Sequence, residues 1–435
     1  MHHTVVIGCG TIGLAFGVAL ASRGHKIALY DNAPGKRAAI ADGMRFVREP
    51  EMARAGRAAL DDGRISVLAR LEMSAFPTNY IVCVPSPVNE AGAFDRSALD
   101  AVMAAIAEIA GPDDAVFIRS TLPIGTARGL AATMRDKGLA LLFAATPDRS
   151  VEGRSFADQF TVPHLVGGVD CAAAERARSL LSSLGETIDL GKAEAAEAAK
   201  LFANAWRAAT FAASNAMALA CDAYDLDVQA IFAAASRDFP RFAPPRPGPF
   251  GGTCLPKDLA LLEASVPQKA RPFWQGVRAA ETAFFQSIAS RLDAHLEARP
   301  EPRRIVLAGI AFKGKPAVAD CRGSVAVALG RHLCRQWPTA DIIGWDAEMT
   351  DQQIEDAGFV AAHDLEIAAR AADLLLFCND HSALAEIDLE RLSQASAAGA
   401  LYFDLTGVTS PVRTNLSNTA MHCILGRNAA TELAP

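Results

Sequence analysis

The sequence of 435 residues contains no uninterrupted apolar run of about 18 residues, the length that a membrane-spanning helix needs. Its first ten residues, MHHTVVIGCG, enter a predicted strand at once, without the basic region and cleavage site of a secretory signal. We therefore expect a cytoplasmic protein that has no membrane as a partner.

Paired cysteines and an excess of positive charge are also missing. The nine cysteines are scattered and include no C-x-x-C pair, so the sequence indicates neither a disulfide framework nor a metal site. The formal net charge of −7 offers no basic surface for nucleic acid. Any anionic ligand must therefore be bound by a few local lysines and arginines.

Apolar residues are abundant, at 51% of a chain that is too long for a single core. Strand-like runs such as NYIVCVPSP and DAVFIRST alternate with helical stretches, as in a parallel sheet wound on both faces. Residues 192–239 contain neither glycine nor proline and are rich in alanine, which predicts a long helix. Four further strand-like runs follow the linker-like EARPEPRR. The predicted α/β fold has two Rossmann-like doubly wound parallel-sheet domains, residues 1–190 and 299–435, joined by a central long-helix domain, residues 191–298.

A glycine motif follows the first predicted strand. Residues 4–31 read as a strand, the pattern G-x-G-x-x-G, an apolar helix, and a second strand that ends in an acid. Such glycines allow a tight turn, close approach of a pyrophosphate and close helix packing, with the helix N-terminus facing the phosphates. The acid would accept a hydrogen bond from a ribose hydroxyl and repel a 2′-phosphate, which predicts NAD rather than NADP. A plain glycine turn would not need this combination. The predicted cofactor contacts are Gly8, Gly10, Thr11, Ile12, Gly13 and Asp31.

Four short clusters elsewhere carry reactive side chains: STLPIGT, PDRSVEG, KLFAN and GGTCLPKD. Taken singly, each has an ordinary structural interpretation. Lys200 and Asn204 share a helix face that is more often solvated than catalytic. A lone Cys254 is more often a buried thiol than a nucleophile, although a glycine-rich loop with Lys257 nearby would favour the thiolate.

Together the motifs resemble those of the nucleotide-sugar 6-dehydrogenases, the family of UDP-glucose, GDP-mannose and UDP-N-acetylhexosamine dehydrogenases. Eight motifs occur in family order over nearly the whole chain: VIGCGTIG, CVPSP, STLPIGT, PDRSVEG, AAKLFAN, PGPFGGTCLPKD, GIAFKG and DCRGS. The resemblance implies an NAD domain, a helical domain that forms a homodimer, and a last domain that binds the nucleotide of a UDP-sugar. It also implies oxidation of a primary alcohol to a carboxylate with two NAD, through a thioester on the loop cysteine.

The resemblance assigns catalytic roles by position. Cys254 would be the nucleophile, and Lys200 and Asn204 resemble the pair that binds the developing oxyanion. Thr121 and Asp258 resemble the residues that hold the hydrolytic water. The cofactor contacts implied in addition are Val84, Pro85 and Thr121.

Three features depart from the family's pattern. Asp148 stands where the family has the glutamate that acts as base in thioester hydrolysis, and its side chain is one methylene shorter. Ala216 stands where many members have glutamate. The spacing from Lys313 to Asp320 is longer than in much of the family. Glu152, in contrast, resembles a second carboxylate near the sugar end of the site.

The motifs PDRSVEG and FCNDH resemble those of the UDP-N-acetylhexosamine branch more than those of the UDP-glucose enzymes. We therefore expect NAD-dependent oxidation of the C6 hydroxyl of such a sugar to the uronic acid. The alternatives are UDP-glucose 6-dehydrogenase and a member that binds NAD and nucleotide sugar without turnover. A two-electron 3-hydroxy-acid dehydrogenase would have no use for the cysteine loop. The implied substrate contacts are Gly251, Lys257, Phe312, Lys313, Arg322 and Arg241, the last reaching the neighbouring subunit's substrate.

Overall fold

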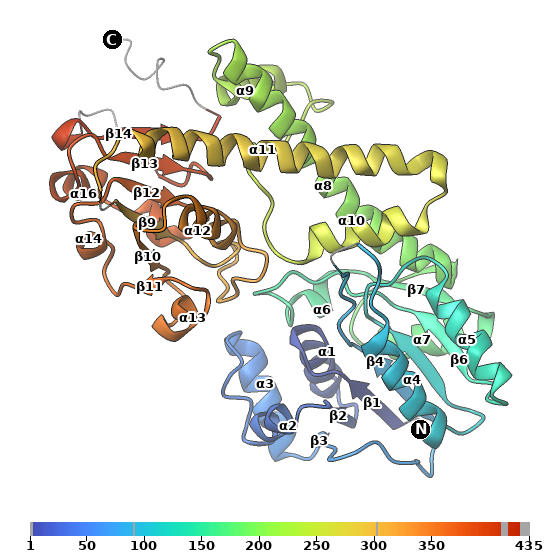
Figure 1. Ribbon diagram of the computed structural model, residues 1–435. Helices are drawn as coiled ribbons and strands as arrows, with labels where there is room; N and C mark the ends of the chain where they lie inside the picture. Colours follow the sequence, from blue (N-terminus) through green and yellow to red (C-terminus); the bar gives the residue numbers. More distant parts are fainter. Residues whose placement is uncertain (1–2, 90–91, 302, 410–415, 427–435) are drawn as a thin grey trace. The chain divides into compact units, whose positions relative to one another are not determined.

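The computed structural model describes residues 3–89, 92–301, 303–409 and 416–426 (Figure 1). The chain forms two compact units. The first comprises Met1–Ala205 and Lys257–Pro267, and the second Trp206–Pro256 and Gln268–Pro435. The predicted central segment, residues 191–298, is thus divided between the two units. Among the described residues, no helix combines the length and apolar character needed to cross a membrane.

The first unit contains an eight-stranded sheet of order β3-β2-β1-β4-β5-β6-β7-β8. Its first six strands run parallel, whereas β7 pairs antiparallel with β6, so the last two strands run the other way. The chain order reverses between β1 and β4, which is where the loops after adjacent parallel strands form a binding crevice. The strands are β1 (His3–Ile7), β2 (Ile27–Tyr30), β3 (Ile65–Val67), β4 (Thr78–Val82), β5 (Ala115–Ile118), β6 (Leu142–Ala145), β7 (His164–Gly168) and β8 (Thr187–Lys192).

Helices cover both faces of this sheet because its central strands are apolar on both sides. Val6 packs with α1, α3 and α7 on one face, whereas its neighbours Val5 and Ile7 pack with α4 and α5 on the other. The helices are α1 (Thr11–Ser22), α2 (Pro34–Ala41), α3 (Pro50–Asp61), α4 (Ser97–Ile109), α5 (Thr126–Asp136), α6 (Asp158–Thr161) and α7 (Cys171–Leu181).

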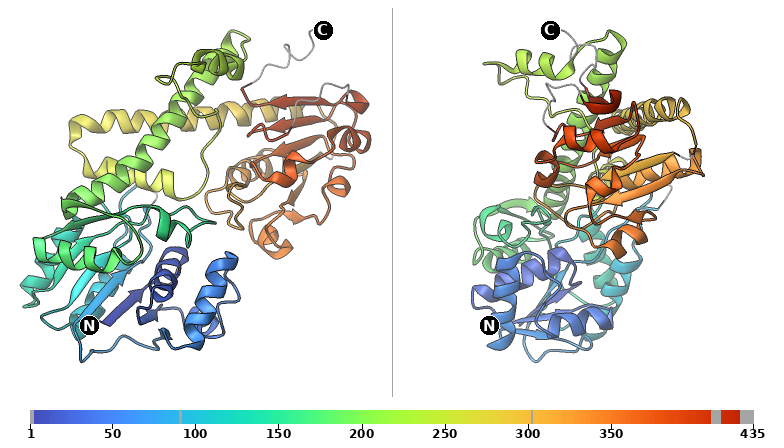
Figure 2. Two further views of the ribbon diagram at one scale, coloured as in Figure 1. Left: turned by 180° about the vertical axis from the view of Figure 1, so that it is seen from behind. Right: turned by 90° about the vertical axis from the view of Figure 1, so that its left-hand side faces the viewer.

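The alanine-rich segment forms the predicted long helix, α8 (Ala193–Ala223), one unbroken helix of 31 residues (Figure 2). It ends before a turn in which Asp225 has a positive φ of 58°. Asp227 then accepts a hydrogen bond from the Ala230 N–H and caps the next helix. The following elements are α9 (Val228–Ser236), α10 (Cys254–Ser265), η1 (Gln268–Ala270) and α11 (Arg271–Glu297).

The second unit contains a six-stranded parallel sheet of order β11-β10-β9-β12-β13-β14. Four of its strands lie in the four predicted runs, and the short β11 and the edge strand β14 were not predicted. The elements are β9 (Arg304–Ala308), α12 (Val325–Gln336), β10 (Asp341–Trp345), α13 (Asp351–Asp356), β11 (Val360–Ala361), α14 (Leu365–Ala368), β12 (Leu374–Phe377), α15 (Ser382–Ala385), α16 (Leu389–Ala395), β13 (Leu401–Asp404), η2 (Ser417–Thr419) and β14 (Met421–Ile424).

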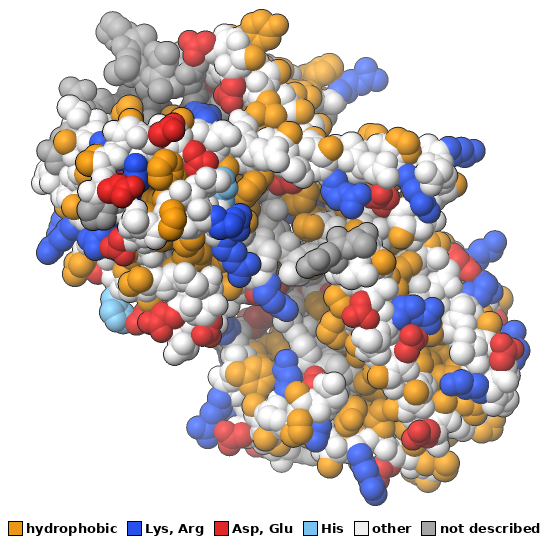
Figure 3. Space-filling view, viewed as in Figure 1, with side chains coloured by type: hydrophobic (Ala, Val, Ile, Leu, Met, Phe, Trp, Pro, Cys, Tyr) orange, Lys and Arg blue, Asp and Glu red, His pale blue; other side chains and the backbone are white. Residues whose placement is uncertain are grey.

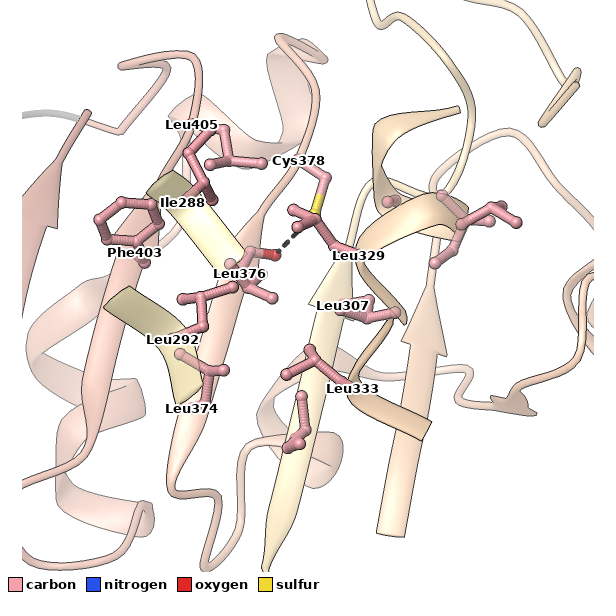
Figure 4. Packing of buried hydrophobic residues seen from close by; sticks show 14 of the residues in the cluster. Ile288, Leu292, Leu307, Leu329, Leu333, Leu374, Leu376, Cys378, Phe403 and Leu405 are labelled. Carbon is pink, nitrogen blue, oxygen red and sulfur yellow. Dashed lines mark hydrogen bonds between the residues drawn. The ribbon is translucent and has the colours of Figure 1, made fainter. Parts of the chain in front are cut away.

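Alternation along the strands again builds two cores. In Figure 4, Leu307 of β9 and Leu374 and Leu376 of β12 face side chains of α11 and α12, including Ile288 and Leu333. The alternate residues of the same strands pack against α14, α15 and α16 on the opposite face. The α11 helix is thus anchored in the core of the second unit.

Candidate active site

The glycine motif forms the loop between β1 and α1, and two of its three glycines leave no room for a Cβ. Gly8 has a φ of +90°, and a Cβ there would lie 2.6 Å from the Cys83 carbonyl oxygen. A Cβ on Gly13 would lie 1.9 Å from the Gly8 carbonyl oxygen. Around Gly10, in contrast, a Cβ would meet no atom within 4 Å. The loop thus has no space for a side chain at Gly8 or Gly13, whereas the space beside Gly10 is open, as close approach of a pyrophosphate to the backbone requires.

The N-terminus of α1 is suited to an anionic ligand. Thr11 and Ile12 lie in its first turn, and its N-cap residue, Gly10, makes no side-chain cap hydrogen bond. Val84 and Pro85 follow the adjacent strand β4, and Ser120 Oγ, after β5, donates 2.6 Å to the Val84 carbonyl. These loops leave neighbouring strands at the same sheet edge. The residues present therefore fit a bound dinucleotide.

Asp31 directly follows β2 and is held in place by backbone donors. Its Oδ2 accepts from the Cys9 N–H at 2.9 Å, and its Oδ1 accepts from the Ala33 N–H at 3.0 Å. Each oxygen keeps a second lone pair for a ribose hydroxyl. The carboxylate lies beside the glycine loop, where the sequence predicts the adenosine ribose.

Three of the predicted site residues meet in one hydrogen-bonded network of the first unit. Asn204 Nδ2 donates to Asp258 Oδ2 at 2.5 Å, and Lys257 Nζ donates to Asp258 Oδ1 at 2.5 Å. Lys257 also donates to Ser86 Oγ at 3.2 Å, in the predicted CVPSP motif. Asp258 is only 1% exposed, so its charge is compensated by these donors rather than by water. Lys200 lies one turn before Asn204 on α8 and is partly buried.

Glu197 joins α8 to the loop that contains Thr121, a role that the sequence analysis missed. Its carboxylate accepts from the Gly125 N–H at 2.6 Å and the Ala127 N–H at 2.8 Å, at the start of α5. Burial raises its pKa to about 7, although the two N–H donors oppose that rise. Its spacing of three residues before Lys200 was the available signal, because it predicts a shared helix face.

Asp148 lies in a buried ion pair with Arg119. Its Oδ1 accepts from Arg119 at 2.5 Å and from Gln159 at 3.1 Å, and its Oδ2 accepts from the Ser150 N–H and hydroxyl at 3.0 and 2.5 Å. Burial raises the pKa of this carboxyl, but Arg119, Ser150 and Gln159 together bring it below its ordinary value. Both lone pairs of each oxygen are thus engaged. This geometry differs from that of a general base, which needs an oxygen available to water.

The remaining catalytic candidates of the first unit lie in loops. Thr121 follows β5, and Glu152 lies in the turn after Asp148; both are partly buried. Within the described residues, no group of three or more His, Cys, Asp or Glu side chains could hold a metal ion.

In the second unit, the loop that leads to Cys254 packs against the segment Phe312–Gly323. The Gly252 N–H donates to the Gly323 carbonyl at 2.9 Å. Gly252 has a φ of +83°, and a Cβ there would lie 2.9 Å from the Phe312 ring. A Cβ on Gly251 would lie 3.0 Å from the Phe312 carbonyl oxygen. The glycines next to Cys254 thus allow close contact with the predicted substrate-binding motifs.

Cys254 itself is exposed and is the first residue of α10, the helix that carries Lys257 and Asp258. A side chain at the start of a helix lies near the positive end of the helix dipole. Asp258 follows one helical turn later.

The predicted substrate contacts of the last domain lie in one closed loop. The Phe312 N–H donates to the Asp320 carbonyl at 2.9 Å, and Arg322 binds the Asp320 carboxylate at 2.6 Å. Lys313 Nζ lies 5.4 Å from the centre of the Phe312 ring. The long Lys313–Asp320 segment is thus tied at both ends. Arg241 is exposed in the loop after α9.

Charged side chains of both signs are interspersed on the face shown in Figure 3. This face has no broad basic surface, as the formal net charge of −7 leads us to expect.

Comparison with known proteins gives relatives over nearly the full length. The chain is 27% identical over 400 residues to the UDP-N-acetyl-D-mannosamine dehydrogenase of Pyrococcus horikoshii, covering 90% of this chain and 92% of that one. It is 26% identical over 403 residues to the NDP-N-acetyl-D-galactosaminuronic acid dehydrogenase of Ralstonia solanacearum, covering 89% and 92%. The solved structure of the UDP-D-ManNAc dehydrogenase from Pyrococcus horikoshii matches with a TM-score of 0.87 at 25% identity, covering 98% of this chain and 100% of that one.

Three family models match in order along the chain. Residues 2–184 match the NAD binding domain of the UDP-glucose/GDP-mannose dehydrogenase family, residues 194–282 its central domain, and residues 306–411 its UDP binding domain. The predicted α/β fold, NAD as cofactor and the nucleotide-sugar dehydrogenase class are confirmed. The chain belongs to the UDP-glucose/GDP-mannose dehydrogenase family.

Proposed function

We propose that this protein oxidises the C6 hydroxyl of a UDP-N-acetylhexosamine to the carboxylate through a thioester on Cys254. The observation that carries the proposal is the setting of Cys254. The thiol begins α10, follows two glycines that pack on Phe312, and precedes the carboxylate of Asp258 by one turn. The names of the two relatives favour an N-acetylated sugar over glucose.

Bound NAD would accept one hydride in each of two oxidations. Gly8, Gly10 and Gly13 would hold its pyrophosphate at the start of α1, and Asp31 would bind the adenosine ribose. Thr11, Ile12, Val84, Pro85 and Thr121 complete the proposed cofactor contacts.

The first oxidation removes a hydride from C6 and a proton from its hydroxyl, which gives an aldehyde. The Cys254 thiolate then adds to the aldehyde carbon, and the carbonyl electron pair becomes an alkoxide, which Lys200 and Asn204 stabilise. Loss of a second hydride leaves the thioester. Water adds to the thioester carbon with loss of one proton and expels the thiolate, which gives the carboxylic acid, and loss of a second proton gives the carboxylate. Lys200 and Asn204 belong to the first unit and Cys254 to the second. The proposal that they serve one reaction rests on the family match, which covers both units.

We assign the hydrolytic water to Thr121 and Asp258. Because Asp148 already accepts four hydrogen bonds, we propose that it fixes the loop 147–152 through Arg119 and so positions Glu152, rather than acting as the base itself. Gly251, Lys257, Phe312, Lys313 and Arg322 are the proposed substrate contacts.

We further propose a homodimer formed along α8. Its surface exposes Phe202, Trp206, Met217 and several alanines, and Trp206 is 68% exposed. An apolar face of this kind is typical of a helix that packs against another chain. Arg241, which is exposed, would reach the substrate of the partner subunit.

Production of NADH with a panel of nucleotide sugars tests the function. UDP-N-acetylmannosamine and UDP-N-acetylgalactosamine should give higher kcat/KM than UDP-glucose. A binding protein without turnover would produce no NADH with any sugar. We place the enzyme in the cytoplasm, where its uronic acid product would serve polysaccharide biosynthesis.

A further inference from the structure

A polar pair outside the predicted catalytic set holds the segment that leads to Cys254. Asn215, on α8, accepts from the Gly248 N–H at 2.8 Å and donates to the Gly248 carbonyl at 3.2 Å. Glu281, on α11, accepts from the Phe250 N–H at 3.1 Å. The two side chains are joined by a hydrogen bond of 3.0 Å from Asn215 Nδ2 to Glu281 Oε2. All four residues lie in the second unit.

These contacts fix the backbone at several points before the thiol. The Asn215–Glu281 pair holds Gly248 and Phe250, and Gly252 is held from the other side by the Gly323 carbonyl. The Phe250 ring also lies 6.3 Å from the Phe211 ring on α8. The loop is therefore restrained up to two residues before Cys254.

The pair is not an ordinary surface contact. Asn215 is fully buried, and burial raises the pKa of Glu281 to about 7 against the opposing effect of the Phe250 and Asn215 donors. The two carboxylate oxygens of Glu281 accept one hydrogen bond each, from the Phe250 N–H and from the Asn215 amide. A glutamine at this position has only one acceptor oxygen, so it would leave one of the two donors without an acceptor. Val277 and Phe284, the helical neighbours of Glu281 on α11, are buried core residues.

We propose that Glu281 is a positioning residue, which, with Asn215, fixes the backbone conformation from which Cys254 presents its thiol. The proposal rests on the proposed function, in which Cys254 is the nucleophile. Glu281 itself would touch neither substrate nor cofactor. Its effect would pass through the Phe250 N–H and through Asn215 to the loop.

Three variants separate positioning from simple stability. Glu281→Gln removes one acceptor, and Asn215→Asp sets two carboxylates against each other. The double variant restores the side-chain pair with the amide and the carboxylate exchanged and keeps the acceptors for Gly248 and Phe250, while the Gly248 carbonyl loses its donor. Glu297→Gln, at the exposed end of the same helix, is the matched control.

The rate of Cys254 alkylation by iodoacetamide, measured by peptide mass spectrometry, reports on the loop without catalysis. The exposed Cys334 on α12 gives the internal reference in each sample. We expect the Cys254 to Cys334 rate ratio to change by about threefold or more in each single variant and to return toward wild type in the double variant, as expected for coupled residues. Glu297→Gln should leave the ratio unchanged.

In parallel, kcat should fall by about tenfold or more in Glu281→Gln, while the KM for NAD changes by no more than about twofold. Glu281→Asp, which keeps the charge but shortens the reach, should also lower kcat and serves if the Gln variant does not fold. A wild-type alkylation ratio and kcat in folded variants that have only a lower Tm would overturn the proposal. A wild type that yields one NADH per sugar would instead overturn the proposed function. The alkylation ratio would still test whether Glu281 positions the loop that leads to Cys254.

Discussion

Asn204 and Asp258 are joined by a hydrogen bond of 2.5 Å between α8 and α10, and Lys257 occupies the other oxygen of the same buried carboxylate. This arrangement fixes the positions of the Asp258 side chain and of the Asn204 amide together. A change at either residue therefore affects the other.

We expect Asp258→Asn to lower kcat for acid formation by about 100-fold, because the neutral amide cannot pair with Lys257 and releases the Asn204 amide. Steady-state kinetics with NAD and the preferred sugar measures this loss. Asp100→Asn, which removes an exposed ion pair with Arg96, is the control and should keep wild-type kcat. Equal activity of the two variants would remove Asp258 from the proposed machinery.

Asp148→Asn should lower the free energy of unfolding by about 3 kcal/mol, because it leaves the buried Arg119 guanidinium without a charged partner. In the folded fraction, the two oxidations and the hydrolysis should slow together. Urea unfolding and single-turnover kinetics check both statements. Slow release of acid with normal stability and a normal first hydride transfer would instead identify Asp148 as the base.

Asp31→Ala should reduce the preference for NAD over NADP. The carboxylate repels a 2′-phosphate, and its loss also frees the Cys9 N–H that it holds. We expect kcat/KM with NAD to fall by about tenfold or more and that with NADP to rise. Initial rates with both cofactors test this. An unchanged ratio of kcat/KM with NAD to kcat/KM with NADP would show that Asp31 does not bind the adenosine ribose.

Glu197 should make stability depend on pH. Folding raises the pKa of its carboxyl from 4.5 to about 7, so the folded state binds the proton more tightly than the unfolded state. Its contribution to stability is therefore fully present below pH 4.5 and is lost as the pH rises to about 7, by an amount on the order of 3 kcal/mol.

Urea unfolding of wild type and Glu197→Gln at several pH values between 4.5 and 8 tests this difference. The free energy of unfolding of the Gln variant should fall less steeply with pH than that of wild type. Parallel pH profiles would show that the carboxyl titrates normally in the folded protein.

The sequence motifs predicted most of the fold because each depends on local pattern. The glycine loop, Asp31 and the long helix all follow from neighbouring residues. The direction of β7 was not predicted, since the alternation of apolar residues is the same in parallel and antiparallel strands. The two short elements β11 and β14 carry too few residues for a distinct pattern.

The features of the site that the sequence analysis missed, the role of Glu197 and the ion pair of Asp148, depend on contacts between distant segments. Glu197 and Asp148 bind partners 72 and 29 residues away, respectively, and sequence alone gives no such distances. In the sequence Asp148 therefore resembles an accessible base, whereas in the structure Arg119 and Ser150 bind its oxygens. Glu281 carries a local signal, since it falls between Val277 and Phe284 on the apolar face of α11.

The number of NADH molecules formed for each nucleotide sugar consumed is the most direct test of the thioester on Cys254. Wild type should give two NADH and one carboxylate for each sugar, and Cys254→Ala should form no acid, because no thiolate adds to the aldehyde. One NADH per sugar in wild type, together with full activity of Cys254→Ala, would contradict the account.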